Sequence, residues 1–303
     1  MHYGSCVSHS ESYILHIEMK DRSATRPAAR RRPPGTVTSG RSPGALPLNQ
    51  SVEKALAVLR AFGGERRALT LGDIAAAAGI TKSSAQRISR TLEHLGLVQR
   101  DVHAKGWVLS PRVLTIGYAY LSGHALIEGA TSHLLGLNTA TGESVSLSEP
   151  DDTQMVYVAR FPGHRPFQIH MPIGRALPMF CTAAGRAYLS RLPTDEVSAI
   201  LDRSTLRALT STTVTDRKRI LALVREARDC GYACADQECY RGDLTIGAAV
   251  MGPHGRPVGA INIAGPTSRW TLEDLAQRWA PLLMETARAA SSGMAERIAP
   301  ASV

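Results

Sequence analysis

The hydrophobic pattern takes on a helical period at residue 51. Apolar side chains recur there every three or four positions, which predicts an amphipathic helix that ends at Gly63. This stripe consists of Val52, Leu56, Leu59 and Phe62. An alanine-rich second helix is expected after the capping sequence Thr70-Leu71-Gly72-Asp73, with Gly79 as its left-handed C′ residue. Thr81 is an N-cap candidate for a third helix that Gly96 stops, and such a pair of short helices around a tight turn is typical of a helix-turn-helix.

The third helix is expected to have two different faces. At 100° per residue its apolar positions fall together, while short polar and cationic side chains fall on the opposite side. Arginine matches the edge of guanine, glutamine matches adenine, and serine or lysine reaches phosphate, so this side suits a DNA major groove. The candidate DNA contacts are Thr81, Lys82, Ser83, Ser84, Gln86, Arg87 and Arg90. Solvated helix faces are also often rich in Arg and Gln, so this helix alone leaves both interpretations open.

A short hairpin is expected directly after the third helix. Leu97–Arg100 and Trp107–Leu109 are apolar strands, and the polar tip between them contains Lys105, a further candidate DNA contact. A hairpin in this position is a wing. Residues 48–110 are therefore predicted to form a winged helix-turn-helix domain that binds DNA with sequence specificity.

The charge distribution sets the first part of the chain apart from the rest. The 303 residues have a net charge of +9. Residues 1–47 carry a surplus of four basic residues and residues 48–125 a surplus of five, whereas residues 126–303 carry eighteen of each sign. This pattern is typical of a basic module that binds a polyanion and is joined to a neutral module. A basic surface that only keeps the protein soluble would give the same pattern. Residues 1–47 are Arg-, Pro- and Gly-rich and are expected to be a disordered basic extension, with Met1 or Met19 as the translation start.

The second half mixes helices with antiparallel strands. A helical stripe that continues from Pro111 predicts a linker helix over residues 111–137. Hairpins are expected around residues 145–159 and 245–263, with further helices at 182–191, 194–201 and 216–229 and one from Thr271. Because strands and helices do not alternate strictly, residues 138–292 are predicted to form an antiparallel α/β domain in an α+β protein, followed by a tail at 293–303.

Composition and motifs disfavour several other classes. There is no run of about 18 apolar residues, so no membrane association is expected, and five cysteines are too few for a disulfide scaffold and suit the cytoplasm. Cys230, Cys234 and Cys239 have spacings seen in metal sites, but a helix end and a strand bring them together poorly, so no metal is expected. Neither a phosphate-binding glycine loop nor a nucleophile and base pair is present, so no cofactor and no enzyme activity are expected. The alternatives are a small-molecule enzyme with an accessory DNA-binding module and a nonspecific basic DNA-coating protein.

Several segments of this chain stand in an order shared with a known family. They are Ser51–Leu59, Leu69–Ala75, Thr81–Arg87, Leu109–Leu114, Thr141–Val145, Tyr157–Arg160, Cys181–Ala187, Gly231–Ala233 and Ala260–Pro266. In this order they resemble the IclR family of bacterial transcriptional regulators, over about residues 48 to 292. The resemblance implies a winged helix-turn-helix, a linker helix and a GAF-like domain that binds a small effector.

The resemblance also implies where the effector binds. The matching positions are Thr182, Ala183, Ala184, Asp236, Thr245, Asn262 and Ala264. Small residues at a helix N-terminus let a carboxylate approach free N–H groups, although Ala183 and Ala184 also suit close helix packing alone. This chain has Gly242-Asp243-Leu244-Thr245 where the family pattern is Gly-Leu-Arg-Ser, and Asp243 repels a carboxylate unless it is protonated or paired. The expected effector is therefore a small organic acid, less acidic than a dicarboxylate or bearing a donor such as an aromatic hydroxyl.

The expected partners follow from this organisation. Two recognition helices in a homodimer or homotetramer would read a pseudo-palindromic double-stranded operator, with pairing of the linker helices as the contact between protomers. Effector binding would change operator affinity through a coupling of about 1–3 kcal/mol. The sequence favours neither repression nor activation and indicates no particular operon.

Overall fold

The computed structural model describes residues 48–298, with gaps at 64–67, 165–168 and 170. The extension expected over residues 1–47, and with it the choice between Met1 and Met19, lies outside the described residues.

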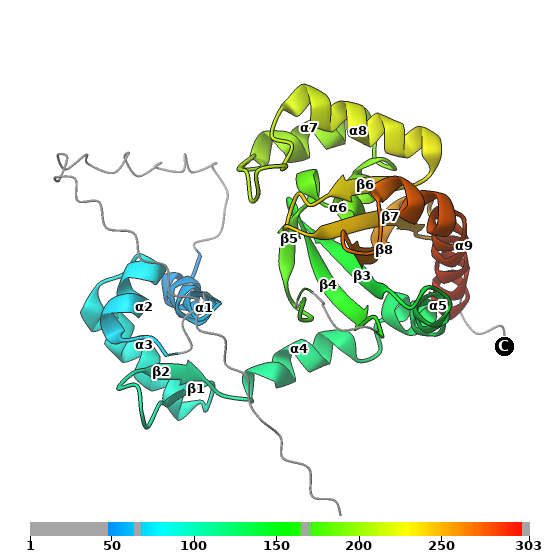
Figure 1. Cartoon of the computed structure of the whole chain (residues 1–303). Helices are drawn as coiled ribbons and strands as arrows, with labels where there is room; N and C mark the ends of the chain where they lie inside the picture. The colour runs from blue at the N-terminus through cyan, green and yellow to red at the C-terminus, as the bar shows by residue number, and fades with distance from the viewer. Residues whose placement is uncertain (1–47, 64–67, 165–168, 170, 299–303) are drawn as a thin grey trace, which may run out of the picture. The chain divides into compact units, whose positions relative to one another are not determined.

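The first part of the described chain is a three-helix unit with a β-hairpin (Figure 1). Its elements are α1 (Gln50–Ala61), α2 (Leu71–Ala78), α3 (Lys82–His94), β1 (Val98–Arg100) and β2 (Trp107–Leu109). The predicted capping is present: the Thr70 hydroxyl accepts the Asp73 N–H at 3.2 Å, and the Asp73 carboxylate accepts the Thr70 N–H at 3.0 Å. Gly79 ends α2 with φ 64°, a conformation that glycine adopts without strain. The predicted winged helix-turn-helix is confirmed.

Only part of the apolar stripe predicted for α1 meets the small core of this unit: Leu59 and Phe62 pack against it. Val58 is fully buried, together with Ile74 and Trp107, whereas Val52 and Leu56 are 53% and 49% exposed. The apolar stripe of α1 is thus wider than the core that it meets, because only one side of the helix packs against α2, α3 and the hairpin.

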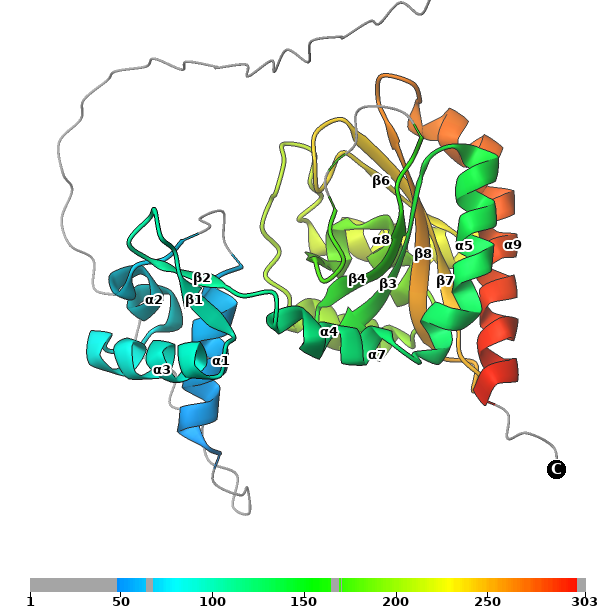
Figure 2. The same ribbon diagram turned by 90° about the horizontal axis from the view of Figure 1, so that it is seen from below.

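The second part is a six-stranded antiparallel sheet covered by helices on both faces (Figure 2). The strand order is β5-β4-β3-β8-β7-β6. The strands are β3 (Ser144–Asp151), β4 (Gln154–Phe161), β5 (Ala176–Pro178), β6 (Ala233–Asp236), β7 (Asp243–Met251) and β8 (Pro257–Pro266). The helices are α5 (Ala125–Thr141), α6 (Ala183–Leu189), α7 (Thr194–Arg203), α8 (Arg217–Cys230) and α9 (Leu272–Ile298), and a 3-10 turn, η1 (Met179–Cys181), precedes α6. The predicted α+β class is confirmed; β5 has no counterpart in the predicted elements.

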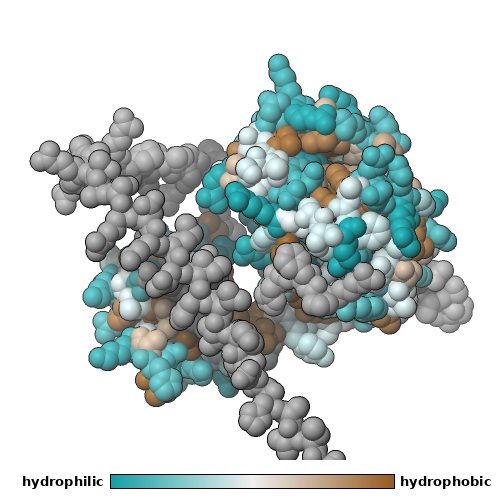
Figure 3. All heavy atoms as spheres, viewed as in Figure 1, coloured by the Kyte–Doolittle hydropathy of each residue, from teal (hydrophilic) through white to brown (hydrophobic). Residues whose placement is uncertain are grey.

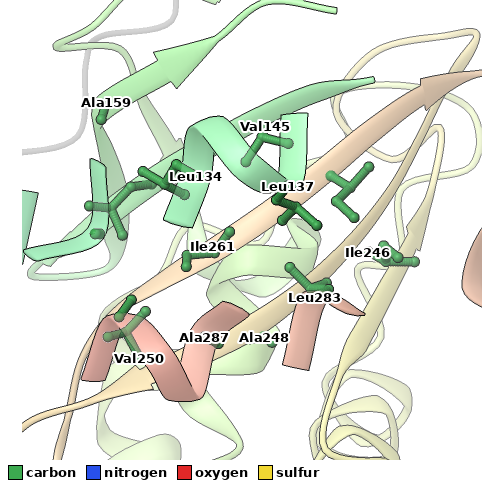
Figure 4. Packing of buried hydrophobic residues seen from close by; sticks show 14 of the residues in the cluster. Leu134, Leu137, Val145, Ala159, Ile246, Ala248, Val250, Ile261, Leu283 and Ala287 are labelled. Atoms are coloured by element: carbon green, nitrogen blue, oxygen red, sulfur yellow. The ribbon is translucent and has the colours of Figure 1, made fainter. Parts of the chain in front are cut away.

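The two faces of the sheet bury different helices. Leu134 of α5 and Leu283 of α9 pack with Ile246 and Ile261 in the larger core (Figure 4). On the opposite face α6 lies directly on the sheet at Gly247, where an added Cβ would stand 2.7 Å from the carbonyl carbon of Ala183. Because side chains alternate along β7, Ile246 and Ala248 face α5 and α9, whereas Gly247 between them faces α6.

The linker differs from the expected single helix over 111–137. It consists of α4 (Val113–Leu121) and α5, separated at Gly123, whose φ of 74° is incompatible with a continuous right-handed helix. The stripe that suggested one linker helix is the buried side of α5, which is part of the core of the sheet domain. At the other end, α9 continues to Ile298, so the tail expected from residue 293 begins inside a helix.

Candidate functional site

The outward face of α3 is formed by exposed polar and basic side chains. Ser83, Gln86, Arg87 and Arg90 are all exposed, and Ala85 and Leu92 on the opposite side are buried. Thr81 caps the helix by accepting the Ser84 N–H at 3.2 Å, which leaves Lys82 exposed in the first turn. This arrangement has the polarity that a helix needs to enter a major groove.

The wing is held in shape by backbone contacts. One carboxylate oxygen of Asp101 accepts the N–H groups of His103 and Ala104, both at 2.7 Å, and these hydrogen bonds lower the pKa of Asp101. The guanidinium of Arg100 lies 3.9 Å from the ring centroid of the buried Trp107. Lys105, with φ 44°, is exposed at the tip. The wing therefore presents the exposed cation of Lys105 beside a turn that Asp101 holds.

Two adjoining cavities, of about 40 and about 20 Å³, lie on the α6 side of the sheet. Tyr157, Met171, Asp243, Thr245 and Asn262 line both. Of the other predicted effector residues, Thr182, Ala183 and Ala184 line the smaller cavity and Ala264 the larger one. Cavities of this size hold a few water molecules.

Asp236 does not line either cavity, contrary to the predicted set. In the register of β6 and β7, Asp236 pairs with Leu244 while Ala235 pairs with Thr245. Directly paired residues share a face of the sheet, so Ala235 and Thr245 face the cavity and Asp236 shares the face of Leu244. Asp236 is exposed at the end of its strand, and Ala235 takes its place in the wall.

A basic and an acidic residue, Arg160 and Asp243, both line the larger cavity. Burial raises the pKa of Asp243 from 3.8 to about 6, and the charge of Arg160 partly offsets this rise. Arg160 comes from β4 and donates to the carbonyl oxygen of Ile169 at 3.0 Å. The Gly242–Thr245 segment lacks the arginine of the family pattern, but Arg160 supplies a positive charge in the same cavity wall. Arg160 was not among the predicted site residues. Its signal was a charged residue that ends the apolar run Tyr157-Val158-Ala159.

Asn262 carries an unused acceptor. Its Oδ1 atom is buried and accepts no hydrogen bond from any described residue, and the whole side chain is 3% exposed. A buried acceptor without a donor costs about 1–3 kcal/mol, so the site is suited to a ligand that brings a donor.

Thr182 is a cap for α6 in this state. Its hydroxyl accepts the Gly185 N–H at 3.1 Å and donates to the Pro178 carbonyl at 3.0 Å. One of the N–H groups at the N-terminus of α6, that of Gly185, is therefore already satisfied by the protein itself. Ala183 and Ala184 both line the cavity and permit the close approach of α6 to Gly247, so the two explanations given for their small size are compatible.

The outer wall of the larger cavity contains a second group that the sequence analysis missed. Glu143 is 5% exposed and accepts hydrogen bonds from the indole of Trp270, at 2.8 Å, and from the guanidinium of Arg269. These residues come from the start of β3 and from the segment before α9, and only the folded sheet brings them together.

The remaining chemistry of the described residues is limited. No group of three or more His, Cys, Asp or Glu side chains among residues 48–298, gaps excepted, is placed to hold a metal ion. Cys230 is exposed at the end of α8, while Cys239 contacts Cys181 rather than Cys234. No helix in the described part of the chain is long and apolar enough to cross a membrane, and hydrophilic residues dominate the face seen in Figure 3.

Comparison with known proteins gives consistent matches along the chain. The family model for the C-terminal domain of the bacterial transcriptional regulator IclR matches residues 118–292, and that for the IclR helix-turn-helix domain matches residues 51–102. The Pca operon regulatory protein of Acinetobacter baylyi is 32% identical over 78% of this chain and 86% of its own length.

Solved structures agree with these matches. A transcriptional regulator from Rhodococcus sp. RHA1 is 37% identical, with a TM-score of 0.71 over 82% of this chain and 99% of that one. An IclR homolog from Microbacterium hydrocarbonoxydans, complexed with 4-hydroxybenzoate, shares the fold at 20% identity, with a TM-score of 0.67 over 80% of this chain and 98% of that one. The relatives are regulators rather than enzymes, which removes the enzyme alternative. With a winged helix-turn-helix and a ligand-binding domain both matched, this chain belongs to the IclR family of bacterial transcriptional regulators.

Proposed function

We propose that α3 reads operator DNA in the major groove through Gln86, Arg87 and Arg90. The observation that supports this is their joint exposure on the face of α3 opposite Ala85 and Leu92. Arg87 and Arg90 would donate to guanine edges and Gln86 to adenine. Thr81, Lys82, Ser83 and Ser84, at the start of the helix, and Lys105 on the wing would position the protein on the phosphates.

The cavity of the second domain is proposed to bind a small aromatic acid that carries a hydroxyl group. Arg160 supplies a cation for the carboxylate, and Asn262 Oδ1 is a buried acceptor that lacks a donor. Asp243, Thr245 and Thr182 add further polar groups, and Ala183, Ala184 and Ala264 leave room for the ring. The Microbacterium hydrocarbonoxydans protein was solved with a ligand of this class. Asp236, exposed and outside the wall, is not part of the proposed site.

Binding of such a ligand is proposed to enlarge the site. The cavities measure about 40 and about 20 Å³, which is small for an aromatic ring, so the walls are expected to move when the ring enters. A ligand that binds only the expanded state shifts the protein toward it, and a coupling of about 1–3 kcal/mol to operator affinity is ordinary for such an equilibrium. Effector binding is thereby proposed to regulate DNA binding.

The protein is proposed to act as a homodimer or homotetramer in the cytoplasm. The motivating feature is α4, in which no residue is buried and Leu114, Ile116 and Tyr118 are 73%, 61% and 69% exposed. A helix that is apolar on its exposed sides is usually covered by a partner. Pairing of α4 between protomers would place two copies of α3 on one operator. Residues 48–110 would form the DNA-binding domain, and the effector-binding domain would include α5 and extend to residue 292.

Titration calorimetry of the full-length protein with 4-hydroxybenzoate, benzoate and phenol tests the effector assignment. Removing the hydroxyl should weaken binding about 10-fold, because Asn262 Oδ1 is again left without a donor, and removing the carboxylate should weaken it similarly. Asn262→Ala should bind 4-hydroxybenzoate and benzoate equally, while Asp236→Asn is the matched control. Equal affinity of the wild-type protein for all three compounds, or no binding of any, would contradict the assignment.

A further inference from the structure

Two cysteines meet at the edge of the proposed effector cavity. The Sγ atoms of Cys181 and Cys239 are 3.6 Å apart, and the Cys239 thiol also lies 3.3 Å from the Cys181 carbonyl oxygen. Fifty-eight positions separate them along the chain. Cys181 ends the turn η1, directly before the cap of α6, and Cys239 lies in the segment between β6 and β7. Contact between these sulfurs therefore depends on the tertiary fold alone.

Both thiols line the smaller cavity, although Cys181 has no exposure at the outer surface. Cys239 is partly exposed, so a small oxidant can reach the pair at this residue. The exposed Cys230 stands on α8 and is not among the residues that line either cavity, so it offers a comparison within the same chain.

From this juxtaposition we propose that Cys181 and Cys239 are a reversible dithiol switch, oxidised by a hydroperoxide to an intramolecular disulfide that locks the effector cavity. One sulfur attacks the O–O bond of hydrogen peroxide and becomes a sulfenic acid, with release of water. The second sulfur then displaces the hydroxyl group as a second water and forms the S–S bond. Two thiols and one peroxide give one disulfide and two waters. The sulfurs have to approach from 3.6 Å to about 2.05 Å, a movement within reach of side-chain rotation and a small shift of the segment.

The disulfide would connect two walls of the cavity. Cys181 is followed by Thr182, Ala183 and Ala184, and Cys239 is four residues before Asp243. A covalent link between these segments opposes the expansion that ligand entry requires. The effect on effector binding rests on the proposed function, whereas formation of the disulfide does not.

The rate of the reaction follows from the environment of Cys239. The hydrogen bond with Cys181 and burial raise the pKa of the Cys239 thiol, so little thiolate is present at neutral pH. We expect the reduced pair to be stable in a reducing cytoplasm and its oxidation to be slower than that of the exposed Cys230.

Peptide mapping by mass spectrometry under non-reducing conditions, after treatment of the full-length protein with hydrogen peroxide, tests the switch. A linked Cys181–Cys239 peptide pair should appear, having lost two hydrogens, and dithiothreitol should reverse it. Cys181→Ser and Cys239→Ser should each abolish the link, and Cys230→Ser should leave it intact. Absence of the link after prolonged treatment, well beyond complete oxidation of Cys230, or accumulation of sulfinic acid on either residue, would overturn the proposal.

Hydrogen exchange tests the locking step without any effector. Amides of residues 237–242 should exchange at least about threefold more slowly in the disulfide form than in the reduced form, since a cross-link suppresses local opening. Unchanged exchange in fully oxidised protein would refute the lock, and this result is independent of whether the cavity binds an aromatic acid.

Discussion

Replacement of Asp243 by asparagine should stabilise the protein at neutral pH. The carboxyl is buried beside the cavity, and its pKa is raised from 3.8 to about 6, so its ionisation is less favourable in the folded than in the unfolded chain. Each pKa unit corresponds to about 1.4 kcal/mol, which makes the cost of the charged form about 3 kcal/mol at pH 7.5. Asparagine has nearly the same shape and no charge to bury.

The sign of the pH dependence follows from proton linkage. Between pH 4 and pH 6 the folded state binds more protons at Asp243 than the unfolded state does, so the free energy of unfolding falls as pH rises. The contribution of Asp243 is fully present below the unfolded pKa and is lost through the folded pKa near 6. The advantage of Asp243→Asn over the wild type should therefore be large at pH 7.5 and nearly absent at pH 4.

Denaturant-dependent hydrogen exchange of peptides from β7 and β8 measures this free energy in the intact chain. Asp236→Asn is the matched control, because Asp236 is exposed one strand away and its replacement should change stability by less than about 0.5 kcal/mol. An Asp243→Asn protein that is less stable than the wild type at pH 7.5, or equally more stable at both pH values, would refute the reasoning.

Three further changes test other parts of the structure. Gly185→Ala should destabilise the sheet domain by about 1–3 kcal/mol in urea denaturation, because the new Cβ would lie 2.3 Å from the backbone of Met179. Gly117→Ala is the control, since no atom lies within 4 Å of its new Cβ. Arg186→Ala should cost about 3–5 kcal/mol by the same measurement, since it leaves the buried Glu238, now paired at 2.7 Å, without a cation; a loss below 1 kcal/mol would contradict this. Lys105→Ala should lower the salt dependence of DNA binding by about one phosphate contact without changing sequence preference, and an unchanged slope would exclude a phosphate contact at the wing tip.

Local signals in the sequence predicted much of the fold. The Thr70 capping box and the left-handed Gly79 depend only on neighbours in the chain, and both are found as expected. Thr245 and Asn262, which the family resemblance assigned to the effector site, line the cavity. The break in the linker at Gly123, by contrast, was not predicted. A helical stripe of apolar residues does not show where one helix ends and the next begins.

Contacts that depend on the order of the strands could not be predicted in this way. Arg160 reaches the cavity because β4 folds back beside β3, and Glu143 meets Trp270 only after the sheet has closed. Asp236 was assigned to the site by the family resemblance, but its register against Leu244 decides its face. The contact between Cys181 and Cys239 has the same origin, since neither spacing nor periodicity relates positions so far apart.

Fluorescence-anisotropy titration of DNA from upstream of the gene tests the proposed reading of DNA by α3 most directly. Shuffled DNA of equal length is the control, and both are measured at two salt concentrations with the wild type and with Arg87→Ala and Arg90→Ala. We expect the wild type to prefer the upstream DNA at least several hundredfold, also at higher salt. In each variant the free energy of specific binding should weaken by about 1–3 kcal/mol. Equal binding of both DNAs that collapses with salt, or wild-type preference in both variants, would contradict the proposed reading of DNA by α3.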